Sequence, residues 1–145
     1  MRRHPALHPL SRDHHDVLLH ARRLRDDDAR VDAATAATRF ARYLAVLRLH
    51  FAEEDAVLAP RIADPALRRR LLDEHAALLR LAEAGDPALL GARLRDHVRF
   101  EEDVLFPHLE ASLPEAAWAD IKAAGLAFRR RQRPASLTGD EVCFL

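Results

Sequence analysis

Apolar residues recur every three or four positions along most of this chain, which is the period of an amphipathic α-helix. This pattern predicts four long helices over about residues 10–26, 31–62, 66–84 and 88–111, and a shorter fifth over about 114–130. Asp64-Pro65 and Asp86-Pro87 each place an N-cap aspartate before a proline at the first helical position. No segment shows the strict alternation of a half-buried strand. Because the later connections are short, we expect an all-α fold, an antiparallel up-down-up-down four-helix bundle with a short fifth C-terminal helix.

The length of 145 residues suits one domain, which we place over residues 1–131. Residues 132–145 contain Pro, Ser, Thr and Gly and are expected to form a flexible tail. The formal net charge is zero, which argues against a nucleic-acid or acidic-membrane surface. No run approaches the ~20 apolar residues of a membrane span, and no apolar signal core follows the N-terminus. The single cysteine, Cys143, cannot form an internal disulfide, so we expect a soluble, cytoplasmic protein.

Two stretches are near copies of each other: LRLHFAEEDAVLAP over residues 47–60 and LRDHVRFEEDVLFP over residues 94–107. Each carries a histidine followed four residues later by a glutamate, His50 with Glu54 and His97 with Glu101. Residues four apart lie on one helix face about 6 Å apart, here on or beside the apolar stripe. Buried charges are usually paired or bound to a metal. The two pairs therefore indicate half of a dinuclear metal site.

A second repeat relates residues 10–19 to residues 71–80, with Asp13-His14 matching Glu74-His75. Two helix pairs related by a pseudo-two-fold axis would place equivalent ligands on either side of a central cavity. Four imidazoles and two carboxylates suit a pair of first-row metal ions, with the carboxylates bridging. No thiolate lies nearby in the sequence, which excludes an iron–sulfur cluster or a cysteine-based zinc site. The predicted metal ligands are His14, His50, Glu54, His75, His97 and Glu101.

These four elements, in this order and on these helices, resemble the hemerythrin-like (HHE) cation-binding domain family. The resemblance covers about residues 7–109. It implies a four-helix bundle with a non-haem di-iron centre, in which an oxo or hydroxo bridge joins two iron ions; zinc and manganese are the alternative metals. It also implies a small ligand such as O2, NO or peroxide, bound reversibly or sensed, or a role in iron handling. A sensing role would need a separate redox or signalling protein as partner.

The sequence departs from the oxygen-carrying hemerythrins, which have a second histidine one turn beyond the ligand on the third helix. Leu79 stands at that position here, and Leu18 stands at the matching position after His14. A site poorer in nitrogen ligands favours redox reaction, sensing or metal exchange over simple oxygen carriage. The alternative functions are therefore a di-iron enzyme with peroxidase, catalase-like or oxidase activity, and a structural bundle without metal.

Several neighbours of the predicted ligands admit two interpretations. His15 competes with His14, but the repeat and the apolar stripe favour His14. Glu53 could add a third carboxylate, although a surface role is favoured because its counterpart in the repeat is Phe100. Tyr43 either gates the cavity or, as we favour, packs in the core with its hydroxyl satisfied.

Asp13 and Glu74 either form salt bridges across helix ends or accept a hydrogen bond from an imidazole N–H. The remaining polar residues near the motifs are assigned to the surface. These are the solvated acids Asp55, Glu102 and Asp103, the incidental histidines His4, His8, His20 and His108, and the basic helix end formed by Arg129, Arg130, Arg131 and Arg133.

Overall fold

A computed structural model describes residues 2–27 and 30–132. Within these ranges all regular structure is helical and there is no strand, so the predicted all-α class is confirmed. The tail expected from residue 132 lies outside the described residues, except for Gln132, which ends the last helix. The elements in chain order are η1 (Pro5–Leu7), α1 (His8–Asp27), α2 (Ala33–Val57), η3 (Ala59–Arg61), α3 (Pro65–Glu83), α4 (Pro87–Phe100), η4 (Glu101–Leu105), α5 (Phe106–Ser112) and α6 (Glu115–Gln132).

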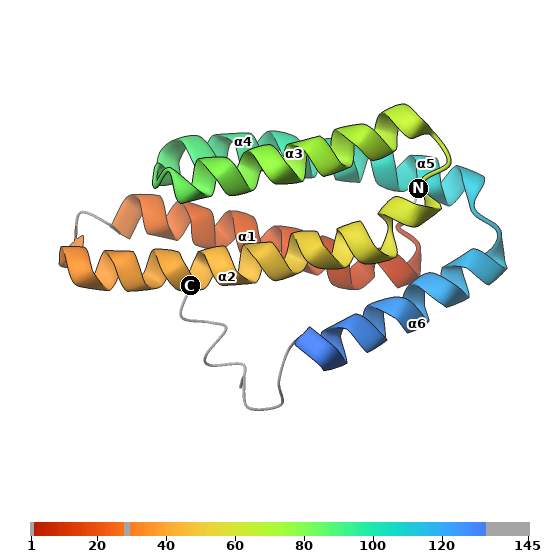
Figure 1. Cartoon of the computed structure of the whole chain (residues 1–145), viewed down its shortest axis with the longest axis horizontal. Helices are drawn as coiled ribbons and strands as arrows, with labels where there is room; N and C mark the ends of the chain where they lie inside the picture. Colours follow the sequence, from red (N-terminus) through yellow and green to blue (C-terminus); the bar gives the residue numbers. More distant parts are fainter. Residues whose placement is uncertain (1, 28–29, 133–145) are drawn as a thin grey trace.

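Helices α1 to α4 lie side by side, and the chain reverses direction at each connection between them (Figure 1). Helix α1 contacts α2 and α4, and α3 contacts the same two helices, so the four surround a common interior. Helix α6 packs against α2 and η1, outside this group. The segment from α4 through η4 to α5 is continuous and corresponds to the single helix predicted over residues 88–111.

The ends of α2 differ from the prediction of a helix over residues 31–62. Asp32 is the N-cap, because its carboxylate accepts a hydrogen bond of 2.8 Å from the backbone N–H of Thr35. The helix ends at Val57 and the chain continues as the 3₁₀ turn η3, which contains Pro60. Proline lacks the N–H that another α-helical turn would use. The first boundary therefore follows from Asp32, and the position of Pro60 is compatible with the second.

A π-helical turn, η4, begins at Glu101. The backbone N–H of Phe106 bonds to the carbonyl of Glu101, five residues back, whereas Leu58 bonds to Glu54 at the ordinary spacing of four. Such turns are rare and frequently occur at functional sites. The extra residue places Phe106, which has no exposed surface, one turn beyond Glu101. The two sequence copies thus differ in backbone at the same position.

The buried apolar residues form two separate clusters along the helices. One includes Leu10, Leu71 and Leu105, and the other includes Val17 and Leu78. Along α1, α3 and the α4–η4 segment, the ligand residues predicted from sequence come between members of the two clusters. The interior therefore has a polar layer with an apolar layer on each side.

We expect Asp64→Ala to lower the free energy of unfolding by about 1 kcal/mol. Its carboxylate accepts hydrogen bonds from the backbone N–H groups of Ala66 (2.9 Å) and Leu67 (3.3 Å) at the start of α3. Urea unfolding at fixed metal content would measure the change. Asp120→Ala, an exposed site within α6, is the control and should change stability by less than about 0.5 kcal/mol. Equal effects of the two substitutions would contradict the capping role.

Candidate metal centre

All six residues predicted as metal ligands are buried and face one another in the polar layer. None is more than 2% exposed, and Glu54 and Glu101 have no exposed surface. Helices α1 and α3 each contribute one histidine, and α2 contributes the His50/Glu54 pair. Helix α4 contributes His97, and Glu101 follows directly as the first residue of η4. The structure thus brings together every residue of the predicted set, from four helices.

The six residues form two groups that could each hold a metal ion. His14 and His50 belong to one group, His75 and His97 to the other, and Glu54 and Glu101 to both. In each group one ligand atom per residue lies within 4.8 Å of all the others. Because both carboxylates are shared, they are placed to bridge two ions.

The Nε2 atom of every imidazole points toward these carboxylates. The shortest contacts are 2.7 Å for His14 to Glu101, 3.2 Å for His50 to Glu54, 3.1 Å for His75 to Glu54 and 2.9 Å for His97 to Glu101. Three buried atoms in this space nevertheless lack a hydrogen bond of acceptable geometry: Glu54 Oε2, Glu101 Oε2 and His97 Nε2. Buried polar atoms are normally satisfied. A metal ion would satisfy these atoms, so the residues present fit a metal centre.

The Nδ1 atom of every imidazole contacts a carboxylate on a neighbouring helix segment. The pairs are His14 with Glu102 (2.7 Å), His50 with Asp13 (3.4 Å), His75 with Asp55 (2.6 Å) and His97 with Glu74 (2.9 Å). An ionised carboxylate only accepts, so Nδ1 carries a proton, and an imidazole that loses its Nε2 proton offers the Nε2 lone pair to a metal ion. Outer carboxylates orient metal-bound histidines in this way and raise their basicity.

The outer contacts follow the internal repeat. The acid before the α1 histidine, Asp13, bonds the α2 histidine, and Glu74 before the α3 histidine bonds the α4 histidine in the same way. Asp55 directly follows Glu54, and Glu102 directly follows Glu101. The prediction that Asp55 and Glu102 are merely solvated acids is therefore wrong, because the opposite helix brings an imidazole to each of them. Asp103 is exposed, as predicted.

Close contacts between acids and imidazoles shift the pKa values of both in this layer. Burial alone would lower the pKa of His75, but hydrogen bonds to Asp55, Glu101 and Glu54 raise it to about 11. The pKa of His50 is likewise raised to about 9, against the effect of burial. Burial would raise the pKa of Glu101, but hydrogen bonds from the imidazoles lower it to about 2. Metal ions and protons would compete for the same nitrogen atoms.

Two phenylalanines form the apolar walls of the site. The Phe51 ring stacks on His75 with centroids 4.2 Å apart, and the Phe106 ring stacks on His14 at 5.6 Å. The two occupy different positions in the repeat, since Phe51 aligns with Val98 and Phe106 with Ala59. Neither phenylalanine is recognisable from the sequence as part of the site, because an apolar residue on a core stripe has no distinguishing signal.

Helix α6 reaches the site through Arg129. Its Nε and Nη2 atoms donate to the two carboxylate oxygens of Glu53, each at 2.9 Å, and Nη2 also donates to Asp13 at 2.8 Å. Glu53 is 3% exposed, so the predicted surface role for Glu53 is wrong, and Arg129 is more than a basic helix end. Asp13 takes both of the roles left open from sequence, since it also bonds His50. Arg129 therefore holds an acid that orients a candidate ligand.

The remaining residues have structural or surface positions. Tyr43 is 1% exposed and donates its hydroxyl to the carbonyl of Val17 at 3.0 Å, as expected for core packing, and burial raises its pKa. His15 is exposed and lies outside both groups. His4, predicted to be incidental, caps η1 and stacks on Trp118 at 4.1 Å.

No protein-family model matches this chain, and neither does any curated protein or solved structure. None of the helices in the described part of the chain is long and apolar enough to cross a membrane.

We expect Arg129→Gln to lower the free energy of unfolding by about 1–3 kcal/mol, because it leaves the buried Glu53 carboxylate without its ionic partner. Chemical denaturation would measure the loss. Arg130→Gln changes the next residue of the same helix, which is exposed, and should have little effect. If both variants were equally stable, the Arg129 contacts would have no energetic role.

Proposed function

We propose that this chain is a hemerythrin-like protein that binds two metal ions, most simply iron, in a non-haem centre. Its work would be to bind or sense O2, NO or peroxide, or to handle iron. The observation that carries the proposal is the pair of His/Glu groups that share Glu54 and Glu101. Inert core histidines would not need two shared, fully buried carboxylates, which are costly unless they are paired or bind a metal.

The arrangement of the helices supports the same proposal at the level of fold. We propose that α1 to α4 are the antiparallel up-down-up-down bundle of this family and that α6 is an appended helix. Each of the four neighbouring helix pairs contributes one contact between an imidazole and an outer carboxylate. Ligands on facing helices of a bundle are the usual way to build carboxylate-bridged di-metal sites.

In this proposal the chain's own residues have three roles. The four Nε2 atoms and the shared carboxylates of Glu54 and Glu101 would hold the ions. The outer acids keep each imidazole in the required tautomer. The stacked rings of Phe51 and Phe106 exclude water from the polar layer. The bound metal pair would supply the redox or Lewis-acid chemistry.

The donor count bears on which metal is held. Each group offers two imidazoles and two shared carboxylates. Two histidines with carboxylate and open positions are typical of non-haem iron that reacts with oxygen, whereas four donors could complete a tetrahedral zinc site. Leu18 and Leu79, at the positions where a further histidine could stand, pack against the apolar cluster that contains Val17. This supports reaction or sensing over oxygen carriage.

One observation favours the alternative that the protein is an enzyme of the same fold. A cavity of about 450 Å³ between α3 and α4 is lined by His97 and Glu74 together with Leu78, Leu81 and Leu89. The cavity therefore borders one candidate ligand, His97, and the outer acid that contacts it, Glu74. A peroxidase, catalase-like protein or oxidase would need access to the metal centre for repeated turnover.

We expect the purified protein to contain about two metal ions per chain, measured by elemental analysis, with iron as the major metal. Chelation should lower the melting temperature, because bound metal stabilises the native state by mass action. No metal after reconstitution with iron, together with unchanged stability on chelation, would leave only the structural bundle. Zinc in place of iron would overturn the proposed oxygen chemistry.

The loss of metal on substitution of a ligand should depend on whether that ligand belongs to one metal group or to both. Glu101→Gln is expected to reduce the content of both ions, because Glu101 belongs to both groups, and His14→Ala to reduce mainly one. His15→Ala is the matched control, since His15 is exposed and adjacent to His14. Metal loss in His15→Ala equal to that in His14→Ala would contradict the assignment.

Peroxide turnover by the iron-loaded protein would distinguish the enzyme from the binding protein. The enzyme should show sustained turnover that Glu101→Ala abolishes and His15→Ala retains. A stable ligand adduct without turnover, followed by absorption spectroscopy, would instead favour binding or sensing.

A further inference from the structure

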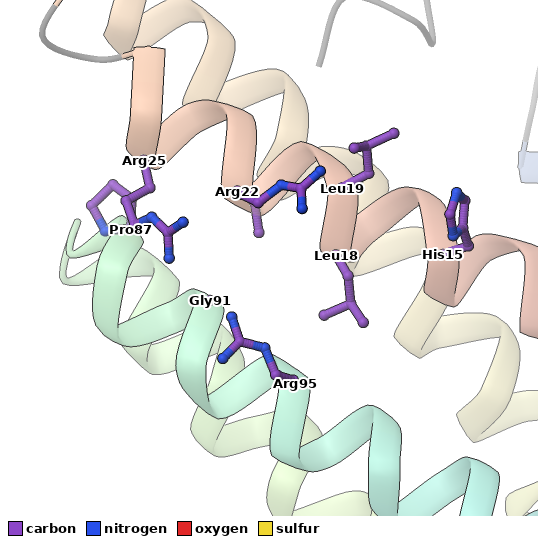
Figure 2. Close-up of a pocket in the computed structure, with 9 residues that line it drawn as sticks. His15, Leu18, Leu19, Arg22, Arg25, Pro87, Gly91 and Arg95 are labelled. Atoms are coloured by element: carbon purple, nitrogen blue, oxygen red, sulfur yellow. The ribbon is translucent and has the colours of Figure 1, made fainter.

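A groove of about 240 Å³ lies on the outside of the molecule, between α1 and α4. Three arginines line it, Arg22 and Arg25 from α1 and Arg95 from α4. Figure 2 shows Arg25 and Arg95 reaching toward the space between the two helices, with Arg22 on α1 beside it. The groove is separate from the polar layer, because none of its lining residues belongs to the candidate metal groups.

The residues that line the groove carry unbalanced positive charge, although the chain as a whole is neutral. The chain has equal numbers of basic and acidic residues, 23 of each, yet no Asp or Glu lines the groove. Arg22 and Arg95 form no ion pair with any side chain that the structure describes. Among the side chains that the structure describes, Arg25 pairs with its exposed neighbour Asp26, through Nε at 3.0 Å. Three arginines around one groove that no acidic residue lines favour binding of an anion.

The floor of the groove consists of small residues. Gly91 lies inside α4, where glycine weakens a helix relative to alanine, and a Cβ added there would meet the Ala21 Cβ at 3.9 Å. The groove is hollow because neither residue has a longer side chain. Leu18 adds an apolar surface next to the guanidinium groups.

We propose that this groove binds a small soluble ligand that carries two or more phosphate groups. Arg22 and Arg25 are three residues apart, about 4.5 Å along the helix axis, so they can bind adjacent phosphates, and Arg95 closes the groove from α4. The planar guanidinium fork binds phosphate oxygens in pairs, which makes arginine the preferred side chain for this recognition. The volume is below the ~300–1,000 Å³ of sites for drug-sized molecules, so the ligand is small.

The test is a calorimetric titration of the full chain with inorganic pyrophosphate at physiological salt. We expect saturable binding that Arg22→Gln/Arg95→Gln weakens by at least about tenfold. The control, Arg23→Gln/Arg93→Gln, removes the same charge from the same two helices at residues that do not line this groove, and should retain the affinity within about twofold. Equal weakening by both double variants would show general electrostatic attraction and overturn the proposal.

A second pair of variants tests the shape of the groove without changing its charge. Gly91→Ala adds only a Cβ, at ordinary contact distance, and should still bind pyrophosphate; Gly91→Leu should fill the groove and abolish binding. Retained binding in Gly91→Leu would place the ligand elsewhere. Metal content is measured before and after each titration, since extraction of metal by pyrophosphate with no binding at the groove would also overturn the proposal.

Phosphate groups can also come from a lipid headgroup, so a parallel arm uses vesicles that contain phosphatidic acid. Binding of pyrophosphate but not of vesicles would support the soluble ligand. Vesicle binding that depends on Arg22 and Arg95 without pyrophosphate binding would overturn it in favour of the lipid source.

Discussion

Glu54 and Glu101 have no exposed surface and lie inside a helical core. Much of the structure around them offsets the free energy that their burial costs. An isolated ionised carboxylate loses its hydration on burial, and a single contact with a neutral group does not compensate for the lost free energy. Burial alone would raise the pKa of both carboxyls. Here four imidazoles surround the pair, and the charge of His50 beside Glu54, together with hydrogen bonds from the imidazoles to both carboxyls, holds the two pKa values below the ordinary range. The charge of the centre is therefore shared between acids and bases, or between acids and a metal that replaces the protons.

This requirement also explains how neighbouring helices are aligned. Each imidazole has its inner nitrogen at the centre and its outer nitrogen on an acid of another helix segment. Sliding one helix by a residue would break both contacts at once. The two apolar clusters alone would tolerate small shifts between helices, so the polar contacts select one alignment.

The two candidate metal groups, one with His14 and His50 and the other with His75 and His97, have the same types of ligand but different neighbouring residues. A π turn follows Glu101 but not Glu54, and it places Phe106 against His14. The other half receives its aromatic wall from Phe51. From helix α6, Arg129 bonds to Glu53 and to Asp13, and Asp13 contacts His50 of the first metal group. Two ions held here would have the same ligand types and unequal surroundings.

The sequence by itself determined the helices, the repeat and the six candidate ligands, because these depend on short-range spacing. The His50/Glu54 and His97/Glu101 pairs are four residues apart, and their helix face is set by the 3.6-residue period alone. The aspartate caps before Pro65 and Pro87 are local for the same reason. The ring of contacting helices agrees with the predicted bundle, whereas the family and the metal stay predictions.

Only the tertiary structure decided which ordinary acids support the site. Asp55 and Glu102 lie next to ligands along the chain, but each contacts a histidine on a different helix, and no local pattern specifies that approach. Glu53 has no acidic counterpart in the repeat, and its partner Arg129 lies 76 residues away. Spacing along one helix predicts which side chains share a face, but the partner of a buried charge is decided by how separate helices pack.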